Sequence, residues 1–535
     1  INRFEGMSNL LKDQETFIND QFDIYVNEAN DLIKQIAIYN KDIASYGNGA
    51  TRTVPLELLD KRELAILKLS EMLEISVLDA ANGEKLVFMN DGQSLVVEQG
   101  EFRLLSLRGD PDPTRKELQL QLNSNSNVLR DVNSKSIGGK LGALVAFREE
   151  ILDPTQVQLG QLALSLTDAM NTQNRLGMTL DGLIGGDLFR MPVFTGLSYR
   201  NNTGTAVASL SLEAGKGKQL PPNDFLITVT AANELRVQAL DSRGQVVPGS
   251  DKVITPINLA GPQVVINSAD EASGDLFGLE ITLDGIPAVG DRFLLKPLQE
   301  AARQLQMATN RGEDLALASP VRSAFTSSNL GNGRVENIVV RSTDTVPPFL
   351  ANQPYRVVYN GGNSFEIFDT TNTSLGIANF SNNNYNNVLA EAGINLGFDF
   401  NISGVPALGD SFTLEFNESG FNDNRNGLVL AGLQNADTTR RNAVTLTGAI
   451  NEFSFNQSYA TMVGTIGERT RQGRTLEEAN SAILEQTTLW YESLSGVSLD
   501  EEAANLTRFQ QTYAAAARIL STSQTIFDTL LQAVR

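Results

Sequence analysis

The sequence predicts an α+β multidomain protein in which a helical rod, built from both ends of the chain, carries two inserted mainly-β modules. Three observations predict this fold class. Apolar residues recur every seven positions near both chain ends, as in helices that pair with other helices. The middle of the chain is rich in Asn, Gly, Thr and Ser and contains short alternating segments typical of strands. A 20-residue segment of that middle region occurs twice, which indicates two modules of one fold.

Composition limits the class of protein before any motif is considered. The chain has 535 residues, 41% of them hydrophobic and 20% charged, which is enough for several domains with sizeable cores. Its formal net charge is -21, from 42 basic and 63 acidic residues, which argues against binding to nucleic acid or anionic lipid. No window of about 20 apolar residues exists, so we predict no membrane-spanning helix.

The chain contains neither Cys nor His. This excludes disulfides, thiol nucleophiles, His-based catalytic triads and ordinary zinc sites, and we expect no catalytic residue, no cofactor and no metal. A chain without disulfides is held by packing alone, and export from the cell is compatible with that composition. The chain starts at Ile1 inside a helical pattern, so we expect further residues to precede it in the full protein.

The C-terminal stretch carries the strongest single pattern. One apolar file consists of Leu499, Leu506, Tyr513, Leu520, Phe527 and Val534, and a second of Phe509, Ala516, Ser523 and Leu530. These are the a and d positions of a heptad repeat, which places one narrow apolar seam on a single long helix. Ser498 is expected to cap that helix, because a Ser side chain accepts hydrogen bonds from the first helical amides. Arg535 is expected to balance the helix dipole at the other end.

A seam this narrow requires another helix against it. We therefore predict an assembly seam formed by Leu499, Leu506, Phe509, Tyr513, Leu520, Phe527 and Leu530. For the half nearest Leu499, an intramolecular core against the N-terminal helix is an equally open interpretation. That N-terminal helix is predicted over residues 1–46, and we expect it to be the natural partner of the C-terminal helix. Its apolar files are Ile18, Tyr25, Leu32, Tyr39 and Tyr46, and Phe22, Ala29, Ile36 and Ile43.

Further elements follow from local signals along the chain. Pro55 opens a shorter helix that ends near Leu73, and a small β-meander follows over 75–105, where the apolar period falls to two. A long helix over 141–175 contains Pro154, which predicts a kink or a join between two helices. Helical patterns return over 422–435 and 453–490.

The internal repeat lies in the β-rich middle. Its copies read GLEITLDGIPAVGDRFLLKP from Gly278 and GFDFNISGVPALGDSFTLEF from Gly397. Both contain a Gly-Asp corner, at Asp291 and at Asp410. We interpret this corner as turn chemistry, in which Gly supplies unusual dihedral angles and Asp caps backbone amides. A cation site is the lesser alternative, since one carboxylate offers too few oxygen ligands.

These patterns divide the chain into a rod and two modules. The predicted rod comprises residues 1–188 and 421–535 and includes the meander, the first β module comprises 189–320, and the second, repeat-related module comprises 321–420. The run NDNRNG from Asn422 resembles the start of a calcium loop, but the twelfth position of that loop, Leu433, lacks a carboxylate. We interpret the run as a turn and helix cap, and we find no active site.

Several segments resemble one family. SGVSLDEEAANLTRFQQTYAAAARILSTSQTIFDTLL, residues 495–531, resembles the C-terminal signature of bacterial flagellar axial proteins, and its first part is most similar to the hook-associated protein 1 family of hook-filament junction proteins. Other segments resemble that family in the same order. They are LLDKRELAILKLSEMLEISV from Leu58, NDGQSLV from Asn90, GGKLGALVAFREEILDP from Gly138, QLGQLALSLTDAMNTQN from Gln158, DRFLLKP from Asp291 and DNRNGLVLAGLQN from Asp423.

The resemblance implies a flagellin-like helical rod and a structural role without enzymatic activity. Such proteins are exported through the flagellar apparatus and form an extracellular ring that joins the hook to the filament. Implied partners are further copies of the chain, the hook protein, the second hook-associated protein and an export chaperone on the C-terminal helix. The family also implies an export helix before Ile1, and Ala516 stands where many axial proteins have Asn. The second β module resembles an additional insertion.

Two alternative functions stay open. A sibling role, as flagellin or the second junction protein, would share the terminal helices, but the long middle helices and the SGVSLDEE phrase argue against it. A surface adhesin or glycan-binding protein would need exposed aromatic residues clustered on one module, and the sequence offers isolated ones such as Tyr355, Tyr359 and Tyr385. A hydrolase with a carboxylate pair from distant segments is more remote.

Overall fold

The computed structural model describes residues 1–47, 55–122, 128–344, 355–418, 420–445, 448, 450–496 and 498–533. The chain forms two compact units, Ile1–Val463 and Gly464–Arg535. None of the described helices has an apolar run long enough to cross a membrane. The boundaries predicted at residues 188, 320 and 420 remain predictions, since the two units are separated within a long helix near the C-terminus.

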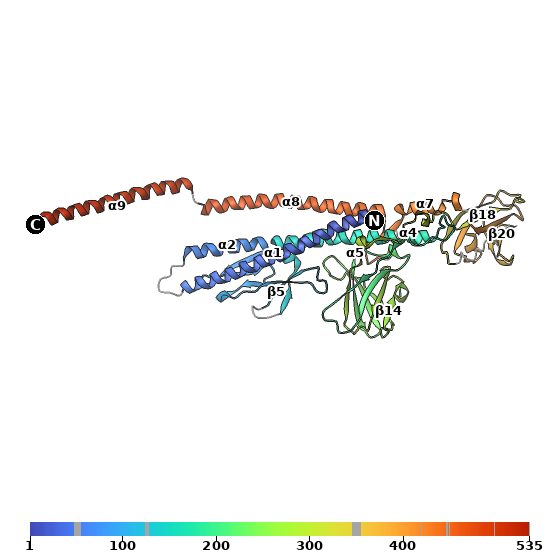
Figure 1. Ribbon diagram of the computed structural model, residues 1–535, viewed down its shortest axis with the longest axis horizontal. Helices are drawn as coiled ribbons and strands as arrows, with labels where there is room; N and C mark the ends of the chain where they lie inside the picture. The colour runs from blue at the N-terminus through green and yellow to red at the C-terminus, as the bar shows by residue number, and fades with distance from the viewer. Residues whose placement is uncertain are drawn as a thin grey trace. The chain divides into compact units, whose positions relative to one another are not determined.

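Unit 1 begins with two helices that lie side by side, α1 (Asn2–Gly47) and α2 (Leu56–Met72) (Figure 1). Both helices were predicted and are confirmed. In the core that they share with the elements that follow, Phe22, Ile33 and Leu69 are completely buried. The two apolar files of α1 are, for the most part, the core face of this unit, with Ile18, Phe22, Ala29, Leu32, Ile36 and Ile43 buried, Tyr25 and Tyr39 half-buried and Tyr46 exposed.

This burial corrects one prediction. We expected these files of α1 to be the natural partner of the C-terminal helix, but α2 and the neighbouring sheets already cover the buried positions. A heptad seam shows that a helix needs an apolar partner and does not specify which segment supplies it.

Two small antiparallel sheets follow α2. The predicted meander is confirmed as β1 (Ile75–Asp79), β2 (Lys85–Met89) and β3 (Ser94–Val96). A second sheet, β4 (Leu105–Arg108), β5 (Glu117–Gln121) and β6 (Leu129–Asp131), was missed because its strands are short and widely separated.

The predicted join at Pro154 is also confirmed. A first helix, α3 (Gly139–Phe147), passes through a π-helical turn, Arg148–Leu152, into α4 (Asp153–Arg175). Pro154 lies in the first turn of α4, where it has no backbone N–H to donate to the preceding turn. Such π-helical turns are rare, and a Pro in the following turn gives this one a local cause.

Two β-rich modules complete most of unit 1. The first contains β7 (Phe189–Arg190), β8 (Phe194–Thr195), β9 (Leu197–Ser198), β10 (Val207–Leu212), β11 (Asp224–Ala231), β12 (Glu234–Leu240), β13 (Lys252–Ile254), β14 (Gln263–Ile266), β15 (Leu279–Asp284), β16 (Arg292–Leu295), α5 (Pro297–Gln304) and β17 (Gln306–Met307). The second contains β18 (Val321–Phe325), β19 (Arg334–Val340), β20 (Tyr355–Gly361), β21 (Ser364–Phe368), β22 (Ser374–Asn379), α6 (Val388–Glu391), β23 (Phe398–Ser403) and β24 (Ser411–Phe416).

The two modules share one topology, as the repeat predicted. Their larger sheets have the orders β13-β12-β11-β16-β9 and β22-β21-β20-β24-β18, which correspond strand for strand. The pairing of β10 with β15 corresponds to that of β19 with β23. Each module has its own apolar core, in which Phe293 and Phe412 occupy the matching repeat position.

The first module is anchored on α4 through α5. Val157 and Leu164 of α4 belong to the module's core, beside Leu298 and Ala301 of α5. Gly160 permits this close approach, since a Cβ at that position would lie 1.8 Å from the Leu298 carbonyl oxygen.

The chain ends in helices. The remaining elements of unit 1 are α7 (Arg425–Gly432), β25 (Asp437–Arg440), β26 (Glu452–Ser454) and the start of α8 (Phe455–Ser495). Unit 2 holds the rest of α8 and α9 (Leu499–Ala533). All three helices were predicted, and α7 is shorter than expected. Short 3-10 turns occur at Glu98–Gly100, Ser134–Ser136, Gly217–Gln219, Ser268–Asp270, Gly312–Asp314, Gly420–Asn422 and Leu433–Asn435.

Candidate assembly surfaces

The helix α9 carries all of the predicted seam residues, and each of them is more than half exposed. They are Leu499, Leu506, Phe509, Tyr513, Leu520, Phe527 and Leu530. Their heptad spacing places them on one face of a single helix. A contiguous exposed strip of large apolar side chains is typical of a surface that binds another protein segment.

The start of α9 is fixed by its predicted cap. The backbone N–H of Glu501 donates to Ser498 Oγ at 3.4 Å, and that of Glu502 donates to the Ser498 carbonyl at 3.0 Å. Asp500 lies in the first turn with both glutamates, where carboxylates favour the positive end of the helix dipole. Arg535, which we expected to balance the other end, lies outside the described residues.

A second apolar strip lies on the part of α8 within unit 2, and the sequence reasoning missed it. Leu476, Ile483 and Trp490 are seven residues apart and are 62%, 60% and 64% exposed. The same heptad count that found the α9 seam would have found this strip. Both helices of unit 2 therefore present apolar faces that their own unit leaves open.

The outer face of α1 carries a third strip. Leu10, Phe17, Ile24 and Ile38 lie at multiples of seven residues and are each more than half exposed, with Asp31 at the intervening position. These are not the α1 residues that we singled out from the sequence, which lie mainly on the buried face. Helix α1 therefore carries two apolar strips, one buried in the core of unit 1 and one exposed on its outer side.

The Gly-Asp corners of the two modules are structural, as predicted. Asp291 accepts backbone hydrogen bonds from Thr203 at 2.8 Å, Gly204 at 3.1 Å and Ala288 at 2.8 Å. Asp410 makes the matching set, with Leu330 at 2.8 Å, Gly331 at 3.0 Å and Ala407 at 2.8 Å. Burial raises the pKa of Asp410, but these amides outweigh it and hold the pKa below its ordinary value.

One pair of residues at these corners escaped the sequence reasoning. Asn202 accepts from the backbone N–H of Arg292 at 2.9 Å and donates to its carbonyl at 2.7 Å, and Asn329 does the same for Ser411 at 2.8 and 2.9 Å. The signal was Asn-x-Gly before the strand in each copy. In the described part of the chain, no group of three or more acidic residues is placed to hold a metal ion.

The aromatic residues weighed for a glycan-binding surface lie mainly inside the second module. Tyr385 is 3% exposed and its ring centroid lies 4.8 Å from that of Phe365 and 6.3 Å from that of Tyr359. Tyr355 and Tyr359 are half-buried. Among the described residues they form a core cluster and not an exposed aromatic face.

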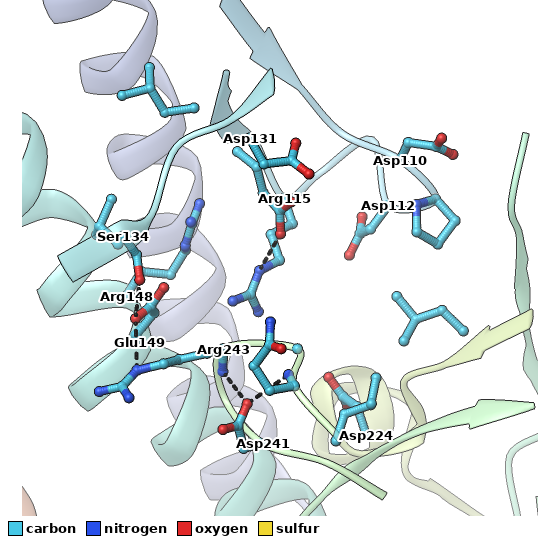
Figure 2. Close-up of a pocket in the computed structure, with 18 of the residues that line it drawn as sticks. Asp110, Asp112, Arg115, Asp131, Ser134, Arg148, Glu149, Asp224, Asp241 and Arg243 are labelled. Atoms are coloured by element: carbon cyan, nitrogen blue, oxygen red, sulfur yellow. Dashed lines mark hydrogen bonds and ion pairs between the residues drawn. The ribbon is translucent and has the colours of Figure 1, made fainter. Parts of the chain in front are cut away.

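A charged cavity of about 820 Å³ lies where the β4-β5-β6 sheet and the α3–α4 turn meet the first module (Figure 2). Ion pairs cross this joint. Lys296 Nζ lies 2.6 Å from Asp112 Oδ2, and Arg243 Nε lies 3.3 Å from Glu149 Oε2. Arg115 donates to the Ser242 carbonyl at 2.7 Å. Because its charges link one part of the chain to another, we assign the cavity a structural role.

The pKa values of two carboxyl groups at the joint are shifted in opposite directions. Burial raises the pKa of Asp112, but the Lys296 ammonium more than offsets this, and the pKa falls to about 2. Burial raises the pKa of Asp224 to about 6. Among the described residues, no donor lies within hydrogen-bond distance of Asp224 Oδ1.

Known proteins are similar to this chain in sequence and in structure. A family model described as the flagellar hook-associated protein FlgK helical domain matches residues 1–189, and one for the flagellar basal body rod FlgEFG protein C-terminal matches residues 491–533. Flagellar hook-associated protein 1 of Salmonella typhimurium is 25% identical over 534 residues, which cover 99% of the chain and 74% of that protein. Its namesake in Escherichia coli is 25% identical over 539 residues, with the same coverage.

A solved structure agrees with these matches. The flagellar hook junction protein FlgK from Burkholderia pseudomallei superposes with a TM-score of 0.72 and 26% sequence identity, covering 93% of the chain and 87% of that structure. The matches therefore extend over the terminal helices and the modules alike. Over nearly its whole length the chain is similar to flagellar hook-associated protein 1 and to the flagellar hook junction protein FlgK.

Proposed function

We propose that the chain is a structural subunit of the extracellular bacterial flagellum that joins the hook to the filament. The exposed heptad seam of α9 carries the proposal, together with the similarity to flagellar hook-associated protein 1. Fully burying one Leu or Phe side chain contributes about 1.5–3 kcal/mol, so a seam of this length can offset the entropic cost of association. The role is mechanical, and we propose no enzymatic activity.

The partners follow from the same surface. Further copies of the chain would form a ring through head-to-tail contacts, which close into a ring when the rotation between neighbouring copies divides a full turn. The hook protein and the second hook-associated protein would contact the two sides of that ring. Before assembly, an export chaperone would cover the seam of α9 and keep it from self-associating, and the chain would leave the cell through the flagellar export apparatus.

Complementation tests this proposal directly. The gene that encodes this chain is expressed in a motile bacterium that lacks its own junction protein, and filaments are counted by electron microscopy. We expect filaments to return. Detection of the chain outside the cell, on hooks that carry no filament and with flagellin shed into the medium, would contradict the proposal.

Substitutions on α9 test the seam itself. Leu520→Asp and Phe527→Asp place a carboxylate in the seam and are expected to abolish filament attachment while unit 1 stays folded. Gln511→Asp adds the same charge to the opposite face of α9 and serves as the matched control. Filament counts that match between the seam variants and this control would show that the seam assignment is wrong.

A further inference from the structure

The loop between β4 and β5 crosses the charged joint and is held there by polar contacts. We call this loop, residues 109–116, the strap. Asp112 of the strap pairs with Lys296 of the first module at 2.6 Å, and Arg115 donates to the Ser242 carbonyl at 2.7 Å. Charges and hydrogen bonds therefore link the strap to the module.

In the described part of the chain, the apolar residues on the two sides of the joint belong to separate clusters. Leu118 and Val145 belong to the core of the rod, and Leu240 and Leu294 to a small cluster on the module's sheet. All four line the cavity of about 820 Å³ that lies between the two sides (Figure 2). The apolar contact of the module with α4, through α5, is a different one and stays intact when the strap moves.

Asp224 faces this joint from the module and lacks a full set of partners. It begins β11, and the register of β11 with β16, continued by one residue, places it opposite Lys296. Gln299 donates to Asp224 Oδ2 at 3.4 Å, whereas Oδ1 accepts no hydrogen bond from any described residue. Asp112 and Asp224 lie on facing walls of the cavity (Figure 2).

The charged groups around Asp224 come from both sides of the joint. They are Lys296 of its own module, Arg115 and Asp112 of the strap, and Asp153 at the start of α4. Lys296 already pairs with Asp112, and Arg115 Nη1 lies 2.7 Å from Asp153 Oδ2. An ionised Asp224 is thus a third carboxylate beside two cations that have partners, and burying its charge costs free energy.

We propose that the strap is a pH-sensitive latch, which is closed on the first module while Asp224 carries a proton and is released when this carboxyl ionises. Burial raises the pKa of Asp224 to about 6 in the closed state, and release into water returns it toward its ordinary value of 3.8. The closed state therefore binds the proton more tightly, and rising pH favours release. Between pH 5 and pH 8 the ratio of released to closed chains is expected to rise about tenfold. The proposal is independent of the α9 seam and of the junction role.

Distances between two spin labels test the latch, because a chain without Cys can be labelled at chosen positions. Pro113→Cys carries one label on the strap, and Gln245→Cys carries the other on the module, where both residues are exposed. Double electron–electron resonance at pH 5 and pH 8 gives the populations of short and long distances. We expect the ratio of long to short distances to rise about tenfold at pH 8.

Three substitutions in the labelled chain separate the latch from a general effect of pH. Asp224→Asn keeps the shape of the side chain without its titration, so short distances are expected at both pH values. Asp112→Asn removes the partner of Lys296 and is expected to give long distances at both pH values. Asp241→Asn is the matched control, because Asp241 lines the same cavity and accepts from the backbone amides of Arg243 and Gln245 in its own turn. It is expected to leave the pH response unchanged.

Two results would overturn the latch. One is a distance distribution that is the same at pH 5 and pH 8 in the labelled chain without further substitution. The other is a pH response that Asp224→Asn leaves intact or that Asp241→Asn removes equally. Circular dichroism of each chain at both pH values verifies that the compared chains are folded.

Discussion

The helices α1 and α9 carry the same kind of heptad pattern and lie in opposite environments. On α1 the pattern forms the core face of unit 1, where Phe22 and Ile36 are completely buried. On α9 it is exposed, and Phe527 is 64% exposed. The difference teaches that a heptad repeat specifies the need for an apolar partner, which α1 finds within its own unit and which we propose α9 finds in another subunit.

We expect the largest effect from truncating one Phe on each helix, which tests the contrast between α1 and α9. Phe22→Ala is expected to destabilise unit 1 by about 3–5 kcal/mol, because it leaves a cavity in a packed core. It also removes the ring beneath the Arg148 guanidinium, 5.3 Å away. Phe527→Ala is expected to change the stability of unit 1 by less than about 0.5 kcal/mol. Urea unfolding followed by near-ultraviolet circular dichroism measures both, and equal losses would contradict the contrast.

A pH titration gives a second way to distinguish unit 1 from unit 2, since the charged joint with Asp112 and Asp224 lies in unit 1. Burial raises the pKa of Asp224 to about 6 in the folded protein, so the folded state binds its proton more tightly than the unfolded chain does. This group therefore favours folding below its ordinary pKa and costs stability as pH rises through about 6. The cost reaches at most about 3 kcal/mol at neutral pH.

Asp224→Asn should flatten this part of the pH profile and raise stability at neutral pH. Asp112 is the internal control, because its lowered pKa stabilises unit 1 above its ordinary pKa and is lost only as pH falls toward about 2. Thermal melts between pH 4 and pH 8 measure the profile, and an unchanged slope in the Asp224→Asn chain would show that this carboxyl is not the cause.

The smallest expected effect concerns the end of α9. Ser498→Ala removes the side chain that accepts from Glu501 N–H and is expected to cost the helix about 1 kcal/mol. The loss should appear as faster amide hydrogen exchange in the first turn of α9, with exchange in α1 unchanged. Protection that stays the same in both helices would mean that Ser498 does not fix the start of α9.

Local chemistry explains what the sequence predicted well. Each of the following features depends on a few neighbouring residues, so the sequence predicts it. They are the helix starts at Pro55 and Ser498, the join at Pro154 and the corners at Asp291 and Asp410. The missed elements depend on distant residues. Lys296 pairs with Asp112 across 184 residues of sequence, a separation that no local pattern encodes.

By itself the sequence determined the fold class, the helical periodicity, the duplicated module and the resemblance to flagellar proteins, because these follow from local periods and from segments that resemble one family in the same order. Only the tertiary structure decided which apolar strip of α1 is buried and which ions meet at the joint. An apolar strip is available to a partner only when no other segment of the fold covers it, and that depends on the packing of the whole chain.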